Sequence, residues 1–250
     1  MSGSPNALSM IRPLSRPLAL AVVLVVAACS GGAGGRNAGG SPDTNAMTTD
    51  SGSGWRTLFD GTSTDAWRGF QKDELPAGWR SDDGALTRVA EGGDIITKEQ
   101  FGDFELELEW KVAPRGNSGI MYRVTEADSA TYRTGPEYQV LDDAGHPDGQ
   151  NRLTSAGSAY GFYAAPAGVV KPAGEWNTTR IVARGNRIEH WLNGTRVVEY
   201  ELGSPDWEAK VKASKFKQWP GYGRAASGHI ALQDHGDRVA YRDIKIRTLP

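Results

Sequence analysis

The sequence predicts an all-β protein, built as a sandwich or jelly roll of two antiparallel sheets. Three observations predict this class: short runs of alternating apolar and polar residues, turn residues between those runs, and almost no helical periodicity. Only residues 205–211 are expected to form a short helix. A long series of strands joined by short turns favours two packed sheets, one of which often curves and exposes a concave face.

The N-terminal part of the chain is predicted to lie outside this fold. Two arginines precede an apolar run that is too short to span a bilayer, which indicates a signal sequence over residues 1–28. Residues 29–54 are rich in Gly and Ser and cannot bury enough apolar surface to offset the entropy of ordering, so we expect a flexible tether. Residues 55–250 contain all eight tryptophans and no second linker, and we expect one β-sandwich domain there.

Alternating residues predict the strands of this domain. From Phe104 to Val112 apolar and charged residues alternate strictly, so one side of that strand faces the core and Glu109 lies on the other. Asn193-Gly194 is a two-residue hairpin turn with positive φ angles. The other predicted strands cover residues 178–183, 187–192, 195–200, 229–234 and 239–247, with further strands around Ile120 and Tyr138.

Polar side chains gather where the strand that contains Tyr138 ends. Tyr138 and Val140 have the inward parity of that strand, so Glu137 and Gln139 face outward. The same rule predicts one polar face, provided that the strands share a sheet, from Glu109, Arg123, Glu137, Gln139, Gln233 and His235. The turn that follows adds Asp142, Asp143, His146 and Asp148, either as part of a ligand site or as a solvated acidic turn.

Several site classes receive little support. Asp142, Asp143, Asp148 and Asn151 offer oxygen ligands at a spacing suited to calcium, but the array lacks the final glutamate of the helix-loop-helix calcium pattern. A solvated acidic turn is favoured, so no metal ligand is assigned and a divalent, calcium-like cofactor stays only an option. The net charge is mildly negative and no basic patch is interleaved with aromatic residues, which argues against nucleic acid as a partner.

Five motifs in order resemble those of the 3-keto-disaccharide hydrolase family. They are Asn117-Ser-Gly-Ile-Met-Tyr-Arg123, Gly135-Pro-Glu-Tyr-Gln-Val-Leu-Asp142, Glu175-Trp-Asn177, His190-Trp-Leu-Asn-Gly194 and Gly228-His-Ile-Ala-Leu-Gln-Asp-His235. The resemblance implies a concanavalin-like jelly-roll sandwich in an exported or lipid-anchored bacterial protein. It also implies cleavage of 3-keto-glycosides by β-elimination across C1 and C2, hydration of the 2-hydroxyglucal product, or both. A sugar 3-dehydrogenase that makes the ketone is then the expected functional partner.

Residue chemistry gives these motifs candidate roles in such a reaction. An elimination needs a base near neutral pKa, donors to the enolate oxygen, and an acid for the departing oxygen. The base is predicted to be Glu137 or His235, and the acid Asp142 or His146. Substrate binding is assigned to Arg123, Gln139, Gln233, Glu109 and Asn117, with Arg123 and Gln233 as donors to the oxyanion and the sugar hydroxyls.

Two alternative functions suit the same fold class. A non-catalytic carbohydrate-binding sandwich needs only aromatic and amide side chains. A conventional glycoside hydrolase needs two carboxylates across the scissile bond, and Glu109 with Glu137 is the pair that the sequence offers.

The end of the predicted signal sequence carries a second resemblance. Val26-Ala27-Ala28-Cys29 resembles the bacterial lipobox, and Cys29 is the only cysteine of the chain. The resemblance implies acylation of Cys29 and membrane attachment through that lipid anchor. Because the neutral Ser30 follows Cys29, the implied location is the cell envelope, on the outer membrane, facing the periplasm or the exterior.

Overall fold

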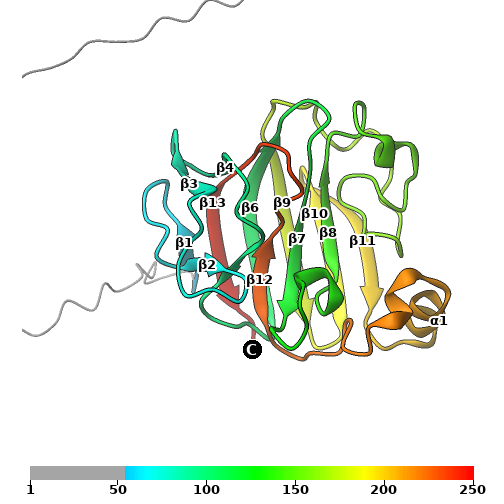
Figure 1. Ribbon diagram of the computed structural model, residues 1–250. Coiled ribbons are helices and arrows are strands. Elements are labelled where there is room, and N and C mark those ends of the chain that lie inside the picture. The colour runs from blue at the N-terminus through cyan, green and yellow to red at the C-terminus, as the bar shows by residue number, and fades with distance from the viewer. Residues whose placement is uncertain (1–53) are drawn as a thin grey trace, which may run out of the picture. The chain divides into compact units, whose positions relative to one another are not determined.

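The computed structural model describes residues 54–250, which form two antiparallel sheets packed face to face (Figure 1). The predicted signal sequence, Cys29 and nearly all of the predicted tether lie outside the described residues. No helix among residues 54–250 is long and apolar enough to cross a membrane. The predicted all-β class and two-sheet sandwich are confirmed.

The larger sheet has eight strands. Its order is β11 (Thr195–Glu201), β10 (Arg187–Leu192), β9 (Asn177–Arg184), β6 (Phe104–Val112), β13 (Val239–Thr248), β4 (Ala85–Arg88) and β3 (Trp79–Asp82), with β1 (Arg56–Phe59) paired to β13. The smaller sheet has five, in the order β2 (Trp67–Gly69), β5 (Ile95–Thr97), β12 (His229–Leu232), β7 (Asn117–Val124) and β8 (Glu137–Leu141). In Figure 1, β12, β7 and β8 lie in front of β6, β9 and β10.

The core lies between the sheets and follows the predicted parity. Leu106 and Trp110 of β6 are fully buried, as are Ile120 of β7 and Tyr138 of β8. The predicted strand at residues 104–112 coincides with β6. In β6 the other row of side chains is mostly half-buried, whereas both rows of β7 and β8 are buried.

Turn chemistry fixes the meander of the larger sheet. Asn193 and Gly194 have φ angles of 48° and 80° between β10 and β11, as the two-residue hairpin turn requires. The short helix predicted at 205–211 is present as α1 (Pro205–Ala213), and the Ser204 hydroxyl accepts a hydrogen bond from the Trp207 amide at 3.2 Å. The short strands β1 to β5 carry no clear alternation, and sequence analysis did not identify them.

Candidate functional site

A cavity of about 280 Å³ opens on the outer face of the five-stranded sheet. Strands β7 and β8 and the turn after β12 form its floor, while the 3₁₀ helices Thr131–Arg133 and Lys215–Gln218 and a loop form its walls. The lining residues are Asn117, Tyr132, Glu137, Gln139, Tyr160, Lys215, Phe216, Trp219, Gln233 and His235. We call this cavity the Glu137 pocket.

Glu137 carries the unusual electrostatics of the pocket. Its side chain is nearly buried, and desolvation, reinforced by the negative charge of Asp94, raises its pKa to about 8. The Lys215 ammonium acts in the opposite direction on the same pKa. Among residues 54–250, no hydrogen bond or ion pair contributes to this shift, so the carboxyl group faces the pocket without a fixed partner.

Gly119 on the neighbouring strand leaves room for this carboxyl group. Gly119 is opposite Gln139 in the β7–β8 ladder, diagonal to Glu137. A Cβ atom built at position 119 would lie 2.3 Å from the Glu137 Oε1 atom, which is far inside contact distance. Glycine at this position is therefore required by the Glu137 conformation rather than by a turn.

Two amides on the floor present unpaired acceptors. Gln139 is fully buried, and its Nε2 atom donates to the Thr154 carbonyl at 3.0 Å, whereas its Oε1 atom has no partner among the described residues. The Asn117 Oδ1 atom is likewise buried without a partner. Buried polar atoms are nearly always satisfied, so these two oxygens are suited to accept hydrogen bonds from a ligand's hydroxyl groups.

Aromatic rings form the opposite wall. The Tyr132 and Trp219 rings meet edge to face with centroids 5.4 Å apart, and Phe216 supports Trp219 at 5.7 Å. The Lys215 ammonium lies 5.1 Å from the centroid of the Tyr160 ring. A pocket with an apolar aromatic wall and a floor of a few polar groups suits a sugar ring.

A second carboxyl group, that of Asp94, lies beside the pocket and is half-buried. Burial raises its pKa, and it accepts hydrogen bonds from the Thr131 hydroxyl and, at 2.9 Å, from the Asp234 amide. These contacts join the loop before β5 to the turn that carries His235. Asp94 therefore positions the pocket and adds to the charge that keeps Glu137 protonated.

Five of the predicted site residues meet in the pocket: Asn117, Glu137, Gln139, Gln233 and His235. Sequence analysis did not single out Tyr132, Tyr160, Lys215, Trp219 or Asp94. Tyr160 lies in a loop, and Lys215 and Trp219 lie in or just after a 3₁₀ helix, where no alternation marks a facing side.

Two predicted members of the polar face lie elsewhere. Glu109 belongs to β6 of the other sheet, where its carboxylate pairs with the Arg242 Nε atom at 2.7 Å. Arg123 has a φ of 53° beside a bulge in the β7–β12 pairing, which turns its side chain away from the pocket. Its guanidinium donates to the carbonyls of Gly102 and Gly185 instead, at 3.1 and 2.7 Å. The parity argument was wrong for Arg123 because a bulge interrupts the alternation.

Asp142 and His146 shape the acidic turn and do not line the pocket. The Asp142 carboxylate accepts the Arg115 amide at 2.7 Å and the Ala144 amide at 3.3 Å. The His146 Nδ1 atom accepts the Asp148 amide at 3.1 Å. Their contacts are those of turn-capping groups and give no support to the predicted acid role.

Backbone amides also bond to two of the other side chains considered for calcium, Asp143 and Asn151. The Asp143 Oδ1 atom accepts the Ala156 amide at 2.7 Å, and the Asn151 Oδ1 atom accepts the Leu153 amide at 3.0 Å. Within residues 54–250, no three His, Cys, Asp or Glu side chains are grouped as metal ligands.

Comparison with known proteins gives consistent matches. The model of a family described as the 3-keto-α-glucoside-1,2-lyase-like domain matches residues 54–247. A 3-keto-disaccharide hydrolase of Bacteroides thetaiotaomicron is 36% identical over 228 residues, which cover 78% of this chain and 79% of that protein.

Solved structures match as well. A candidate glycosyl hydrolase of Parabacteroides distasonis superposes with a TM-score of 0.73 at 32% identity, over 79% of this chain and 94% of the other. A second from the same organism gives a TM-score of 0.60 at 30% identity, over 73% of this chain and 99% of the other.

Proposed function

Because the chain belongs to the 3-keto-α-glucoside-1,2-lyase-like family of carbohydrate-active proteins, we propose that it cleaves 3-keto-glycosides by β-elimination in the Glu137 pocket. The observation that carries the proposal is Glu137, a buried carboxyl group with a pKa near 8 and no fixed partner, facing a sugar-sized cavity. A base of raised pKa accepts a carbon-bound proton more readily than an ordinary carboxylate.

The ketone determines the chemistry. It acidifies the hydrogen at C2, so a base removes that proton and leaves an enolate whose charge rests on the C3 oxygen. The enolate then collapses: the C3 carbonyl re-forms, the electrons of the C2–C3 double bond form a C1–C2 double bond, and the C1–O bond breaks. The departing oxygen takes a proton from an acid. The products are the free alcohol and a 3-keto-2-hydroxyglucal, and no oxidant is needed.

The pocket residues take distinct roles in this reaction. Glu137 in its ionised form removes the C2 proton, and Lys215 stabilises the enolate oxygen by charge, as its effect on the Glu137 pKa indicates that the two groups interact. His235 at the rim protonates the departing oxygen. The carboxamides of Gln233, Asn117 and Gln139 bind hydroxyl groups, and Trp219 with Tyr132 packs on the sugar ring.

Hydration of the glucal in the same pocket completes a net hydrolysis. Water adds across the C1–C2 double bond, with the oxygen bonding to C1 and a proton to C2, and the product is the 3-keto sugar. This sequence of elimination and hydration would account both for the hydrolase name of the relative from Bacteroides thetaiotaomicron and for the lyase name of the family.

We also propose which enzyme supplies the substrate and where in the cell the protein acts. The ketone requires a sugar 3-dehydrogenase upstream, since nothing in the elimination oxidises C3. Acylation of Cys29 would hold the domain at the bacterial cell envelope, and labelling with a radioactive fatty acid, lost in Cys29→Ala, tests this point.

One assay separates the candidate functions. The purified protein is incubated with a glucoside, with its 3-keto derivative, and with the 3-keto derivative carrying deuterium at C2. We expect cleavage of only the keto form, a slower reaction of the deuterated form, and a transient enone absorbance. Cleavage of both glycosides without an isotope effect would indicate a conventional glycosidase. If neither glycoside is cleaved, the protein would be a carbohydrate-binding protein. A parallel series with a chelator tests for a metal requirement.

A further inference from the structure

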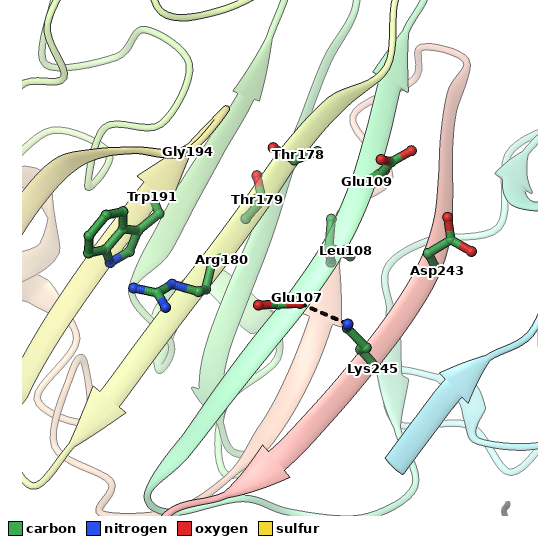
Figure 2. Close-up of a pocket in the computed structure, with 10 residues that line it drawn as sticks. All are labelled: Glu107, Leu108, Glu109, Thr178, Thr179, Arg180, Trp191, Gly194, Asp243 and Lys245. Carbon is green, nitrogen blue, oxygen red and sulfur yellow. Dashed lines mark ion pairs between the residues drawn. The ribbon is translucent and has the colours of Figure 1, made fainter. Parts of the chain in front are cut away.

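A second and larger cavity lies on the opposite side of the sandwich. Its volume is about 610 Å³, and it runs over the outer face of the eight-stranded sheet (Figure 2). Its lining residues include Glu107, Glu109, Arg180, Trp191, Asp243 and Lys245. We call it the outer groove, and none of its lining residues belongs to the Glu137 pocket.

Side chains cross the strands of the outer groove in two rows. In the first row Arg180 is opposite Trp191 on one side and Glu107 on the other, and Glu107 is opposite Lys245. Figure 2 shows these four residues following one another over β10, β9, β6 and β13, with a dashed line between Glu107 and Lys245. These two residues form an ion pair at 2.9 Å.

The second row lies two residues away from the first on β6 and β9, and three residues away on β13, where the bulge adds a residue. In this row Glu109 is opposite Thr178 and Arg242. Neighbouring strands are about 4.8 Å apart, a spacing close to the length of one pyranose unit. A row of hydrogen-bonding groups at that spacing matches the repeat of a sugar chain lying across the strands.

Trp191 closes one end of the first row as a fixed aromatic surface. Its indole Nε1 atom donates to Glu189 at 3.0 Å, and the Arg180 guanidinium stacks 4.2 Å from the centroid of the ring. The ring is therefore held in one orientation and stays partly exposed. Such a ring packs against the apolar face of a sugar at little cost in side-chain entropy.

Asp243 stands at the other end on a strained backbone. It lies in the bulge where the β13–β6 register shifts, with a φ of 52°, and its side chain is 76% exposed. Glycine adopts this backbone conformation without strain, whereas aspartate does so at a cost. The bulge points an acceptor into the groove that regular pairing would not place there.

We propose that the outer groove is a second carbohydrate site, which binds a neutral oligosaccharide across β10, β9, β6 and β13. The charges in and beside the groove favour a neutral ligand. Acidic and basic side chains are balanced there, so a polyanion would gain little electrostatic binding energy. The acids are Glu107, Glu109 and Asp243, and the bases are Arg180, Lys245 and Arg242. Paired ions next to an aromatic ring offer many donors and acceptors to uncharged hydroxyl groups. The site would hold a glycan chain while the opposite face acts on a sugar unit.

The test measures the binding of cellohexaose and maltohexaose to the purified full chain by calorimetry. We expect saturable binding of at least one of them and an affinity about tenfold lower in Trp191→Ala. Trp176→Ala is the matched control, because the Trp176 ring lies on the same sheet face and is likewise stacked on cations, Arg242 and Lys111, at 4.1 and 4.6 Å, but does not line the groove. Asp243→Gly is expected to bind more weakly and to unfold at a higher temperature.

Turnover of a small 3-keto-glucoside distinguishes this proposal from the proposed function. Trp191→Ala is expected to keep full turnover, whereas Trp219→Ala in the Glu137 pocket is expected to keep oligosaccharide binding. The absence of saturable binding at millimolar concentration, or binding that depends on Trp219 and not on Trp191, would overturn the proposal. Tighter binding of an oligogalacturonate than of both neutral probes would contradict the assigned ligand class.

Discussion

The two outer faces of the sandwich both carry glutamates from strands, in opposite electrostatic states. On the eight-stranded sheet, Glu107 and Glu109 pair with Lys245 and Arg242 of β13, at distances of 2.9 and 2.7 Å. On the five-stranded sheet the neighbour opposite Glu137 is Met121, and burial raises the pKa of Glu137 to about 8. Outward parity is the same in both, so ion pairing across the strands on one face and burial under the pocket walls on the other set the electrostatic state of each glutamate.

The strongest test of this comparison is the removal of the Glu137 carboxyl group. Glu137→Gln preserves the size of the side chain but cannot accept a proton, so we expect turnover of a 3-keto-glucoside to fall by about 10²- to 10⁴-fold. Steady-state kinetics measure the effect, and an unchanged circular dichroism spectrum controls for folding. Normal turnover in Glu137→Gln would eliminate the proposed base.

Linkage predicts that Glu137 also controls the pH dependence of stability. The unfolded glutamate loses its proton near its ordinary pKa of 4.5, whereas the folded one retains it up to about 8. Between these values the unfolded state binds fewer protons, so the free energy of unfolding falls as pH rises, by up to about 1.4 kcal/mol per pH unit. Urea denaturation at pH 5, 6, 7 and 8 measures the slope in the wild type.

The matched comparison for that slope is Glu137→Gln, which carries no titrating group at this position. Its free energy of unfolding should follow the wild type at pH 5 and exceed it increasingly toward pH 8. Parallel curves for the two proteins over this range would show that Glu137 ionises as an ordinary exposed carboxyl group.

Removing the charge of Lys215 should change the activity less than removing the Glu137 carboxyl group does, because Lys215 acts on Glu137 and on the enolate only through its positive charge. Its positive charge lowers the Glu137 pKa, so Lys215→Gln should move the rising limb of the kcat/KM profile to higher pH. Loss of the charge near the enolate oxygen should also reduce kcat at the optimum by roughly tenfold. Lys217→Gln is the control, because Lys217 lies in the same 3₁₀ helix, is exposed and does not line the pocket.

The sequence predicted those parts of the molecule that depend on local alternation. The boundaries of β6 and β10, the Asn193-Gly194 turn and the inward rows follow from patterns of a few residues, and the structure confirms them. Alternation also oriented Glu137 and Gln139 correctly. It failed at Arg123, because a bulge in the ladder depends on the neighbouring strand, which one strand's own sequence does not show.

The walls of the pocket could not be predicted for a related reason. Lys215 and Trp219 come from a segment far from β8 in the sequence, and tertiary packing alone brings it over the five-stranded sheet. The assignment of Glu109 to the same face as Glu137 was wrong, because β6 and β8 belong to different sheets. Which strands share a sheet depends on hydrogen bonds between strands that are distant in the sequence. The motifs therefore contain residues of the pocket floor, whereas the walls and the electrostatics of the pocket became visible only in the structure.

The smallest effect on activity and stability is expected for Glu109, which points outward from its strand as Glu137 does but belongs to the other sheet. Glu109→Gln removes a partly exposed pair with Arg242, so the loss of stability should be below about 1 kcal/mol and should shrink at high salt. Turnover should remain at the wild-type level, because Glu109 lies on the far side of the core from Glu137. A loss of turnover approaching that of Glu137→Gln would mean that catalysis depends on the outer face of the eight-stranded sheet, and the distinction between paired and unpaired glutamates would no longer identify the active face.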